Sequence, residues 1–166
     1  MQIVLIRHGD AAKHSPTGED RGRMLSMRGR EESRLVGEEL AKRGIRPDRL
    51  LTSPLERCLR TAELAGEALA VLPIPDERLA AEKPLGPVVE LIKEFGADEE
   101  HRCLALCGHN PRISELAALL EHGPGRPRDM VALATGEALV LEIDRNEPVG
   151  TGRVVERVEA GLLDRA

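Results

Sequence analysis

Three short apolar runs, each followed closely by residues that include arginine or histidine, constrain the fold of this chain most. The runs cover residues 3–6, 50–52 and 103–107. Runs of this length, unbroken by charged residues, are typical of central strands that helices cover on both faces. In such sheets, ligands bind at the carboxyl ends of the strands. The sequence therefore predicts an α/β sheet whose chemistry lies at one edge.

Helical signals fill the segments between these runs. We expect helices over residues 26–43, 54–72, 88–95 and 112–122. The first has a capping serine, Ser26, and a closing glycine, Gly44. The second begins with Ser53, Pro54 and Glu56, which fit a capping serine, a proline at the first helical position and a capping box.

The rest of the chain predicts further extended segments. Residues 130–134, 138–143 and 153–158 have strand patterns and short connections, which imply antiparallel pairing. Residues 74–79 are expected to be extended at most. No repeat or low-complexity stretch divides the chain, so residues 1–166 are expected to form one domain. The predicted fold is a three-layer α/β/α sandwich with a mixed, mostly parallel central sheet.

Composition excludes several classes of protein. Apolar residues make up 41% of the 166, yet Phe95 is the only aromatic one, and the net charge is −5. Base stacking needs aromatic side chains and phosphate-backbone binding needs positive charge, so no nucleic-acid partner is expected. No segment is long enough to span a membrane, and the apolar start is too short for a signal peptide. Three cysteines, an odd number, favour a reducing compartment, and we expect a cytoplasmic location.

Two histidines and two cysteines that lie close in sequence resemble the ligand set of a metal site. These are His101, Cys103, Cys107 and His109. Four residues of strand span roughly 13 Å, which is beyond the reach of a disulfide and too far for shared coordination. We therefore expect neither a disulfide nor a metal there, and no cofactor elsewhere.

The ends of the predicted strands carry the chemistry. Arg7 and His8 follow the first run, Arg57 lies in the opening turns of the second helix, and His109 follows the third run. A cation at a helix N-terminus opposes the helix dipole unless an anion shares the space. Two arginines and two histidines around one point describe a phosphate site, in which neutral His8 can attack phosphorus. Gly9 is expected to let the backbone pass close to the ligand.

Structural explanations compete with this interpretation. A single histidine at a strand end is often structural, and Arg57 could pair with Glu56 or Glu63. Ser53 is expected to be a helix cap rather than a nucleophile. The sequence has no Gly-x-Ser-x-Gly elbow, Walker loop or His-Glu-x-x-His motif. The specific signal is the conjunction of three strand ends that each carry arginine or histidine.

These motifs resemble those of a known family. Arg-His-Gly at 7–9, Ser-Pro-x-x-Arg-x-x-x-Thr at 53–61 and Gly-His-Asn-Pro at 108–111 are similar to motifs of the histidine phosphatase superfamily. The chain length and Arg-His-Gly-Asp-Ala at 7–11 resemble the SixA-type phosphohistidine phosphatases. The resemblance extends over essentially the whole chain.

The resemblance implies a role for each matching residue. His8 would be the phosphorylated nucleophile, and Arg7, Arg57 and His109 would bind the phosphoryl group. Arg21, in the loop before the first helix, is a further candidate ligand. Larger members of the superfamily carry an acidic proton donor in an inserted segment, for which Glu82 is the nearest candidate.

The leading hypothesis is a metal-independent phosphatase, a hydrolase that removes phosphate from phosphohistidine on a partner protein domain. A small-molecule phosphomonoesterase and a non-catalytic phosphate-binding module are the alternatives. A phosphoglycerate mutase is less favoured, because the chain is short for enclosing and turning a sugar phosphate.

Overall fold

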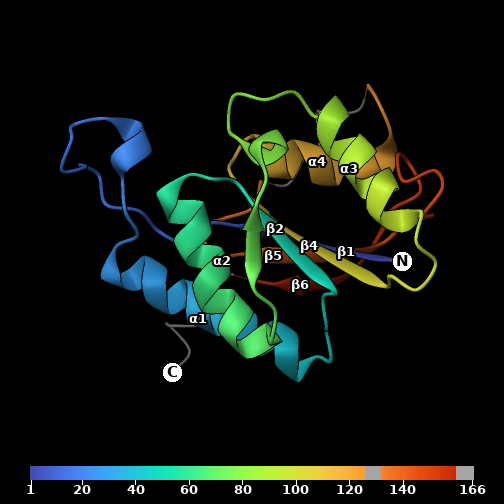
Figure 1. Ribbon diagram of the computed structural model, residues 1–166, viewed down its shortest axis with the longest axis horizontal. Coiled ribbons are helices and arrows are strands. Elements are labelled where there is room, and N and C mark those ends of the chain that lie inside the picture. Colours follow the sequence, from blue (N-terminus) through green and yellow to red (C-terminus); the bar gives the residue numbers. More distant parts are fainter. Residues whose placement is uncertain (126–131, 160–166) are drawn as a thin grey trace.

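A six-stranded sheet with helices on both faces forms the protein, as the computed structural model in Figure 1 shows. The structure describes residues 1–125 and 132–159. The strand order is β3-β2-β4-β1-β5-β6. The strands are β1 (Gln2–Arg7), β2 (Arg49–Thr52), β3 (Pro73–Pro75), β4 (Cys103–Gly108), β5 (Ala138–Glu142) and β6 (Arg153–Val158).

Five strands of this sheet run in one direction, and β5 alone runs the opposite way. β4 pairs in parallel with both β1 and β2, and β2 pairs in parallel with β3. β5 is antiparallel to both β1 and β6. The sheet is therefore mixed and mostly parallel, which confirms the prediction.

Two pairs of helices cover the sheet and close two separate apolar cores (Figure 1). The first face carries α1 (Met27–Lys42) and α2 (Glu56–Leu69), whose Val36, Leu40 and Ala62 join one core. The other face carries α3 (Gly86–Gly96) and α4 (Arg112–His122), whose residues join the second core. The three-layer sandwich is confirmed.

The ends of α1 follow the sequence signals. The Ser26 hydroxyl accepts a hydrogen bond from the Gly29 backbone N–H at 3.0 Å, as a capping serine does. Gly44 has a φ of +79°, the left-handed conformation that ends many helices.

Close contact between α1 and its neighbours depends on residues without side chains. A Cβ atom at Gly37 would lie 2.5 Å from the backbone oxygen of Ala65 in α2. A Cβ atom at Gly29 would overlap the backbone oxygen of Asp10, in the loop that follows β1. The helix therefore lies directly against the backbone of both segments.

The predicted start of α2 is wrong. The helix begins at Glu56 with Leu55 in the capping position, and no side chain caps it. Ser53 accepts only a long hydrogen bond from the Leu55 N–H, at 3.4 Å, and its hydroxyl bonds a residue outside the helix. The sequence Ser-x-x-Glu is typical of a capping box, but here the Ser53 hydroxyl bonds His109 and does not cap the helix.

Two expectations about extended segments also change. Residues 74–79 contain the short strand β3 and then a 3₁₀ turn, η2 (Glu77–Leu79). Of the strand expected over 130–134, residues 130 and 131 lie outside the described residues, and 132–134 form no strand. The Leu133 carbonyl instead accepts hydrogen bonds from side chains.

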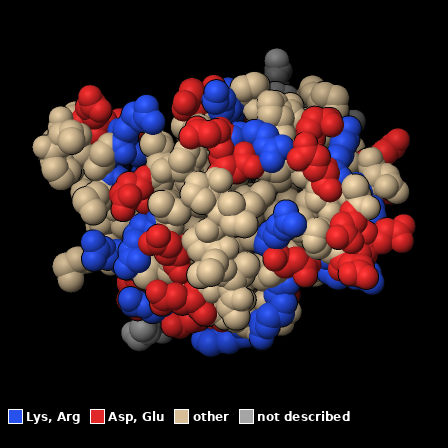
Figure 2. Space-filling view, viewed as in Figure 1, with Lys and Arg blue, Asp and Glu red and all other residues tan. Residues whose placement is uncertain are grey.

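Charge is distributed evenly over the face drawn in Figure 2, where acidic and basic side chains are interspersed. This face carries no broad basic surface of the kind that binds a nucleic-acid backbone. None of the described helices combines the length and the apolar character that a membrane crossing requires.

Candidate active site

Parallel pairing brings the two predicted histidines together. β1 and β4 are neighbours, with Arg7 opposite Gly108, so the next residues, His8 and His109, leave the sheet side by side. Their ring centroids are 5.5 Å apart, with the rings inclined by 61°. Arg57, the second residue of α2, adds its charge to the same place, because it lowers the pKa of both imidazoles. The structure thus gathers Arg7, His8, Arg57 and His109 at one edge of the sheet.

His8 is held with one ring nitrogen free. Its Nδ1 lies 2.8 Å from the Gly9 carbonyl oxygen, which can only accept a hydrogen bond, so Nδ1 carries the proton. The lone pair of Nε2 is then available. Burial lowers the pKa of His8 to about 4, and the charges of Arg57 and Arg7 lower it as well. At neutral pH the ring is therefore an uncharged imidazole.

His109 lies against neutral partners. Its Nε2 is 2.7 Å from the Ser53 hydroxyl oxygen, and the Cys58 sulfur is 3.3 Å from the same nitrogen. Burial lowers the pKa of His109 to about 3, with His8 and Arg57 acting in the same direction. His109 is consequently an uncharged hydrogen-bonding group.

In both Arg7 and Arg57, the Nε atom has no hydrogen-bond partner among the described residues. Nη1 of Arg7 donates to the Leu133 carbonyl at 2.8 Å, and Nη1 of Arg57 donates to the Asp20 carbonyl at 3.0 Å. In each, the Nε atom is buried. A buried donor without an acceptor is costly. The Nε edge of a guanidinium is one of the two that bind phosphate bidentately, so an anion at this place would satisfy both arginines.

A short 3₁₀ turn, η1 (Asp20–Gly22), supports Arg57 from the loop after β1. The Asp20 carboxylate accepts from Nη2 of Arg57 at 3.2 Å and from Nη1 of Arg23 at 3.1 Å. These arginines hold the pKa of Asp20 below its usual value. The carboxylate is therefore ionised and takes the outer edge of the Arg57 guanidinium.

Of the arginines in this loop, Arg23 is the one whose charge reaches the site. Arg23 lowers the pKa of His8, and its Nε donates to the Ala12 carbonyl at 2.7 Å. Arg21 is exposed on η1, and its predicted contact with a phosphoryl group stays a prediction. Sequence reasoning missed Arg23 because both arginines lie in an irregular loop with no periodicity to place them.

Gly9 is needed for packing against α1, and its predicted approach to a ligand stays a prediction. A Cβ atom there would overlap the Gly29 backbone oxygen of α1. Its N–H donates to the Thr61 hydroxyl at 3.1 Å, and that hydroxyl donates to the Arg57 carbonyl at 2.7 Å. The threonine of the Ser-Pro-x-x-Arg-x-x-x-Thr motif thus links the segment that carries His8 to the helix that carries Arg57.

Within the described part of the chain, Glu82, His101, Cys103 and Cys107 show no sign of taking part in the site. Glu82 is exposed, on the segment between η2 and α3. The described residues include no group of three or more His, Cys, Asp or Glu placed to hold a metal ion. His101 stacks on Phe95, with ring centroids 4.4 Å apart, and Cys103 and Cys107 are buried free thiols.

Comparison with known proteins identifies the family. The sequence model of the histidine phosphatase superfamily (branch 1) matches residues 3–88. The phosphohistidine phosphatase SixA of Escherichia coli is 33% identical over 148 residues, which cover 88% of this chain and 89% of the relative. The chain belongs to the histidine phosphatase superfamily. The match to the family model contains Arg7, His8 and Arg57. His109 lies beyond that match and comes directly after the last residue of β4.

Solved structures of this superfamily have the same fold. A histidine phosphatase SixA in complex with tungstate superposes with a TM-score of 0.82 at 24% identity, covering 96% of this chain and 97% of that one. A mycobacterial glucosyl-3-phosphoglycerate phosphatase superposes with a TM-score of 0.70 at 21% identity, covering 93% and 96%. The histidine phosphatase fold therefore extends over nearly the whole chain.

The two depressed histidine pKa values predict how stability depends on pH. Unfolding returns each ring to its ordinary pKa of 6.5, so below that pH the unfolded chain binds more protons than the folded one. The stabilisation is complete above pH 6.5 and is lost as the pH falls toward the folded values. Between pH 6.5 and about pH 5, where carboxyl groups remain mostly ionised, we expect the free energy of unfolding to decrease with falling pH.

Urea unfolding followed by circular dichroism at several pH values measures this slope. The slope should become smaller in His109→Gln and stay unchanged in His14→Gln, which alters an exposed histidine. Equal slopes in all three proteins would contradict the buried, neutral state of His109.

Proposed function

We propose that this protein is a metal-independent phosphatase that works through a phosphohistidine intermediate at His8. The observation that carries the proposal is the free Nε2 lone pair of a buried, neutral His8 beside two arginines whose Nε atoms have no partner among the described residues. Membership of the histidine phosphatase superfamily supports the same chemistry.

The reaction proceeds in two steps. Nε2 of His8 attacks phosphorus, so an N–P bond forms while the bond from phosphorus to the leaving group breaks. Arg7 and Arg57 stabilise the charge on the phosphoryl oxygens, and His109 donates a hydrogen bond to one of them. Water then attacks phosphorus, the N–P bond breaks, orthophosphate leaves, and His8 is restored.

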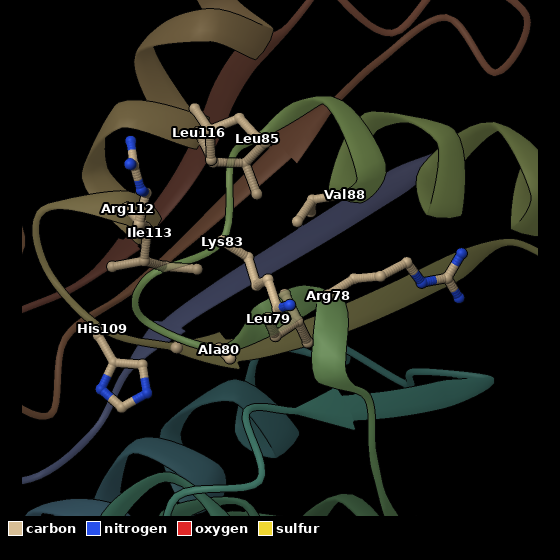
Figure 3. A pocket seen from close by; sticks show the side chains of 11 residues that line it. Arg78, Leu79, Ala80, Lys83, Leu85, Val88, His109, Arg112, Ile113 and Leu116 are labelled. Atoms are coloured by element: carbon tan, nitrogen blue, oxygen red, sulfur yellow. The ribbon is translucent and has the colours of Figure 1, made fainter. Parts of the chain in front are cut away.

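The substrate that we favour is phosphohistidine on a partner protein. A small hollow beside His109 supports this choice (Figure 3). The residues that line it, all within the described part of the chain, include Arg78, Lys83 and Arg112 but no carboxylate. Lys83 faces this hollow while its neighbour Glu82 does not line it. A neutral imidazole can leave with a proton from solvent, whereas an alkoxide needs a placed acid.

A small-molecule phosphomonoesterase is the second candidate. The same hollow has apolar walls, among them Leu79, Val88 and Ile113, with Lys83 at its edge (Figure 3). It could take a leaving group with an apolar body and an anionic end. The structural likeness to a glucosyl-3-phosphoglycerate phosphatase extends to the fold. A cytoplasmic location belongs to the favoured proposal, since phosphohistidine on a partner domain would be met there.

Leaving-group preference is the expected outcome that tests the proposal. The protein should cleave phosphohistidine, and aryl esters with acidic phenols, far faster than alkyl phosphates. If Glu82 takes no part, Glu82→Gln should barely change phosphohistidine turnover. The measurement is kcat/KM for phosphohistidine and for a panel of alkyl phosphates in the parent and in the variant.

Two results would change the assignment. Strong alkyl-ester turnover that disappears in Glu82→Gln would make Glu82 a proton donor and favour the small-molecule enzyme. Phosphate binding without turnover of any of these substrates would leave a phosphate-binding module.

A further inference from the structure

We propose that Ser53 is a positioning residue that sets the tautomer of His109. Its hydroxyl donates to Nε2 of His109, so the ring proton resides on Nδ1, where it is available to a phosphoryl oxygen. That the Nδ1–H of His109 donates to a phosphoryl oxygen rests on the proposed function. The tautomer itself is a property of the protein without substrate.

The first step concerns the direction of the hydrogen bond. Ser53 is fully buried, and its oxygen already accepts, at 3.4 Å, from the Leu55 N–H. The hydroxyl proton therefore needs an acceptor, and Nε2 of His109 lies 2.7 Å away. A buried hydroxyl that donates to nothing costs more than one that is satisfied. Donation to Nε2 meets this requirement and leaves Nδ1 protonated.

The second step concerns the Cys58 thiol, the other polar group against the ring. Its sulfur is 3.3 Å from Nε2 and 3.6 Å from Nδ1 of His109. Burial raises the pKa of Cys58 well above its usual value, so the thiol stays neutral, and its side chain also bonds the Cys107 thiol and the Ser53 hydroxyl. Sulfur is a weak donor and a weak acceptor. The short bond from the serine oxygen consequently decides which nitrogen is protonated.

The third step concerns why the tautomer matters at this site. Among residues 1–125 and 132–159, the groups that bond His109 are a hydroxyl and a thiol, and no carboxylate bonded to the ring keeps it protonated. Burial disfavours protonation of His109 most, His8 and Arg57 act in the same direction, and the opposing effect of Asp20 is smaller than that of Arg57. A neutral imidazole has one N–H, and with Nε2 occupied by Ser53 only Nδ1 can donate. The opposite tautomer would turn a lone pair toward a phosphoryl oxygen.

Nitrogen NMR of the resting protein tests this assignment directly, because the chemical shifts of the two ring nitrogens report which of them is protonated. We expect His109 of the parent protein to carry its proton on Nδ1. Ser53→Ala should move population to the Nε2-protonated form, and Ser53→Thr, which keeps a hydroxyl, should keep the Nδ1-protonated form. Ser33→Ala is the control, because it also removes a fully buried hydroxyl, but from α1. It should leave the spectrum of His109 unchanged.

Turnover gives the second measurement. Ser53→Ala should lose about tenfold in kcat/KM for phosphohistidine, the scale of one buried hydrogen bond or slightly more. Ser53→Thr should recover most of that loss.

A parent spectrum with the proton on Nε2 would overturn the proposal, whether or not the alanine variant folds. An unchanged His109 spectrum in folded Ser53→Ala would also overturn it. If the parent instead has the Nδ1 proton but turns over no phosphorylated substrate, the function proposed above fails and the role of Ser53 stands.

Discussion

His8→Ala should abolish turnover, and with it any phosphorylated form of the enzyme. The side chain supplies the only bond to phosphorus in the proposed reaction, and no neighbouring group can replace it, because His109 has Nε2 committed to Ser53. Rapid quenching of the parent protein with labelled substrate should trap an adduct on His8 that is labile in acid and stable in base. The same experiment on His8→Ala should trap none.

Two controls accompany this variant. His14→Ala changes an exposed histidine outside the site and should keep the parent rate. Circular dichroism should show that His8→Ala retains the fold, since among the described residues the ring hydrogen-bonds only its own segment, through the Gly9 carbonyl. Undiminished turnover in folded His8→Ala would end the proposal of a nucleophile at this position.

Arg57→Ala should lower kcat/KM by on the order of 10²-fold, the scale for one donor to a developing oxyanion. The arginine is buried, and its Nε has no partner among the described residues, so truncation removes charge and donors from the place where we propose that the phosphoryl group binds. Arg57→Lys should recover only part of the loss, because an ammonium group cannot bind two oxygens side by side. Steady-state kinetics with phosphohistidine and with an aryl phosphate measure both variants.

Arg153→Ala is the matched control, since Arg153 is an exposed arginine that pairs with Glu142. It should leave kcat/KM unchanged. Chelator-treated parent enzyme should also keep its rate, because the arginines supply the positive charge that a metal would otherwise provide. A large loss on chelation that Mg²⁺ or Zn²⁺ restores would show that the site works differently.

The architecture and the meeting of the four residues were predictable because each depends on regular structure. Parallel strands end at the same edge, so Arg7-His8 and His109 had to become neighbours once β1 and β4 paired. The cap of α1 at Ser26 depends on residues within one turn, which a sequence records directly.

What could not be predicted depends on contacts between distant segments. Ser53 has the sequence context of a helix cap, but a histidine 56 residues further along the chain takes its hydroxyl. Arg23 and Arg21 have the same side chain in one irregular loop, and only the folded loop makes the charge of Arg23 lower the pKa of His8. Local patterns carry no information about either choice.

The glycines that seat α1 affect how losses of activity should be interpreted. Gly29 lies against the backbone of the loop after β1, and Gly37 lies against α2. A methyl group at Gly29 would push α1 away from the segment that carries His8, and one at Gly37 would push it away from the helix that carries Arg57. Neither glycine has a side chain that could contact a substrate. A screen of random substitutions that scores only lost activity should therefore mark both positions as strongly as true reactive residues. Parallel measurement of protein abundance would separate the two groups.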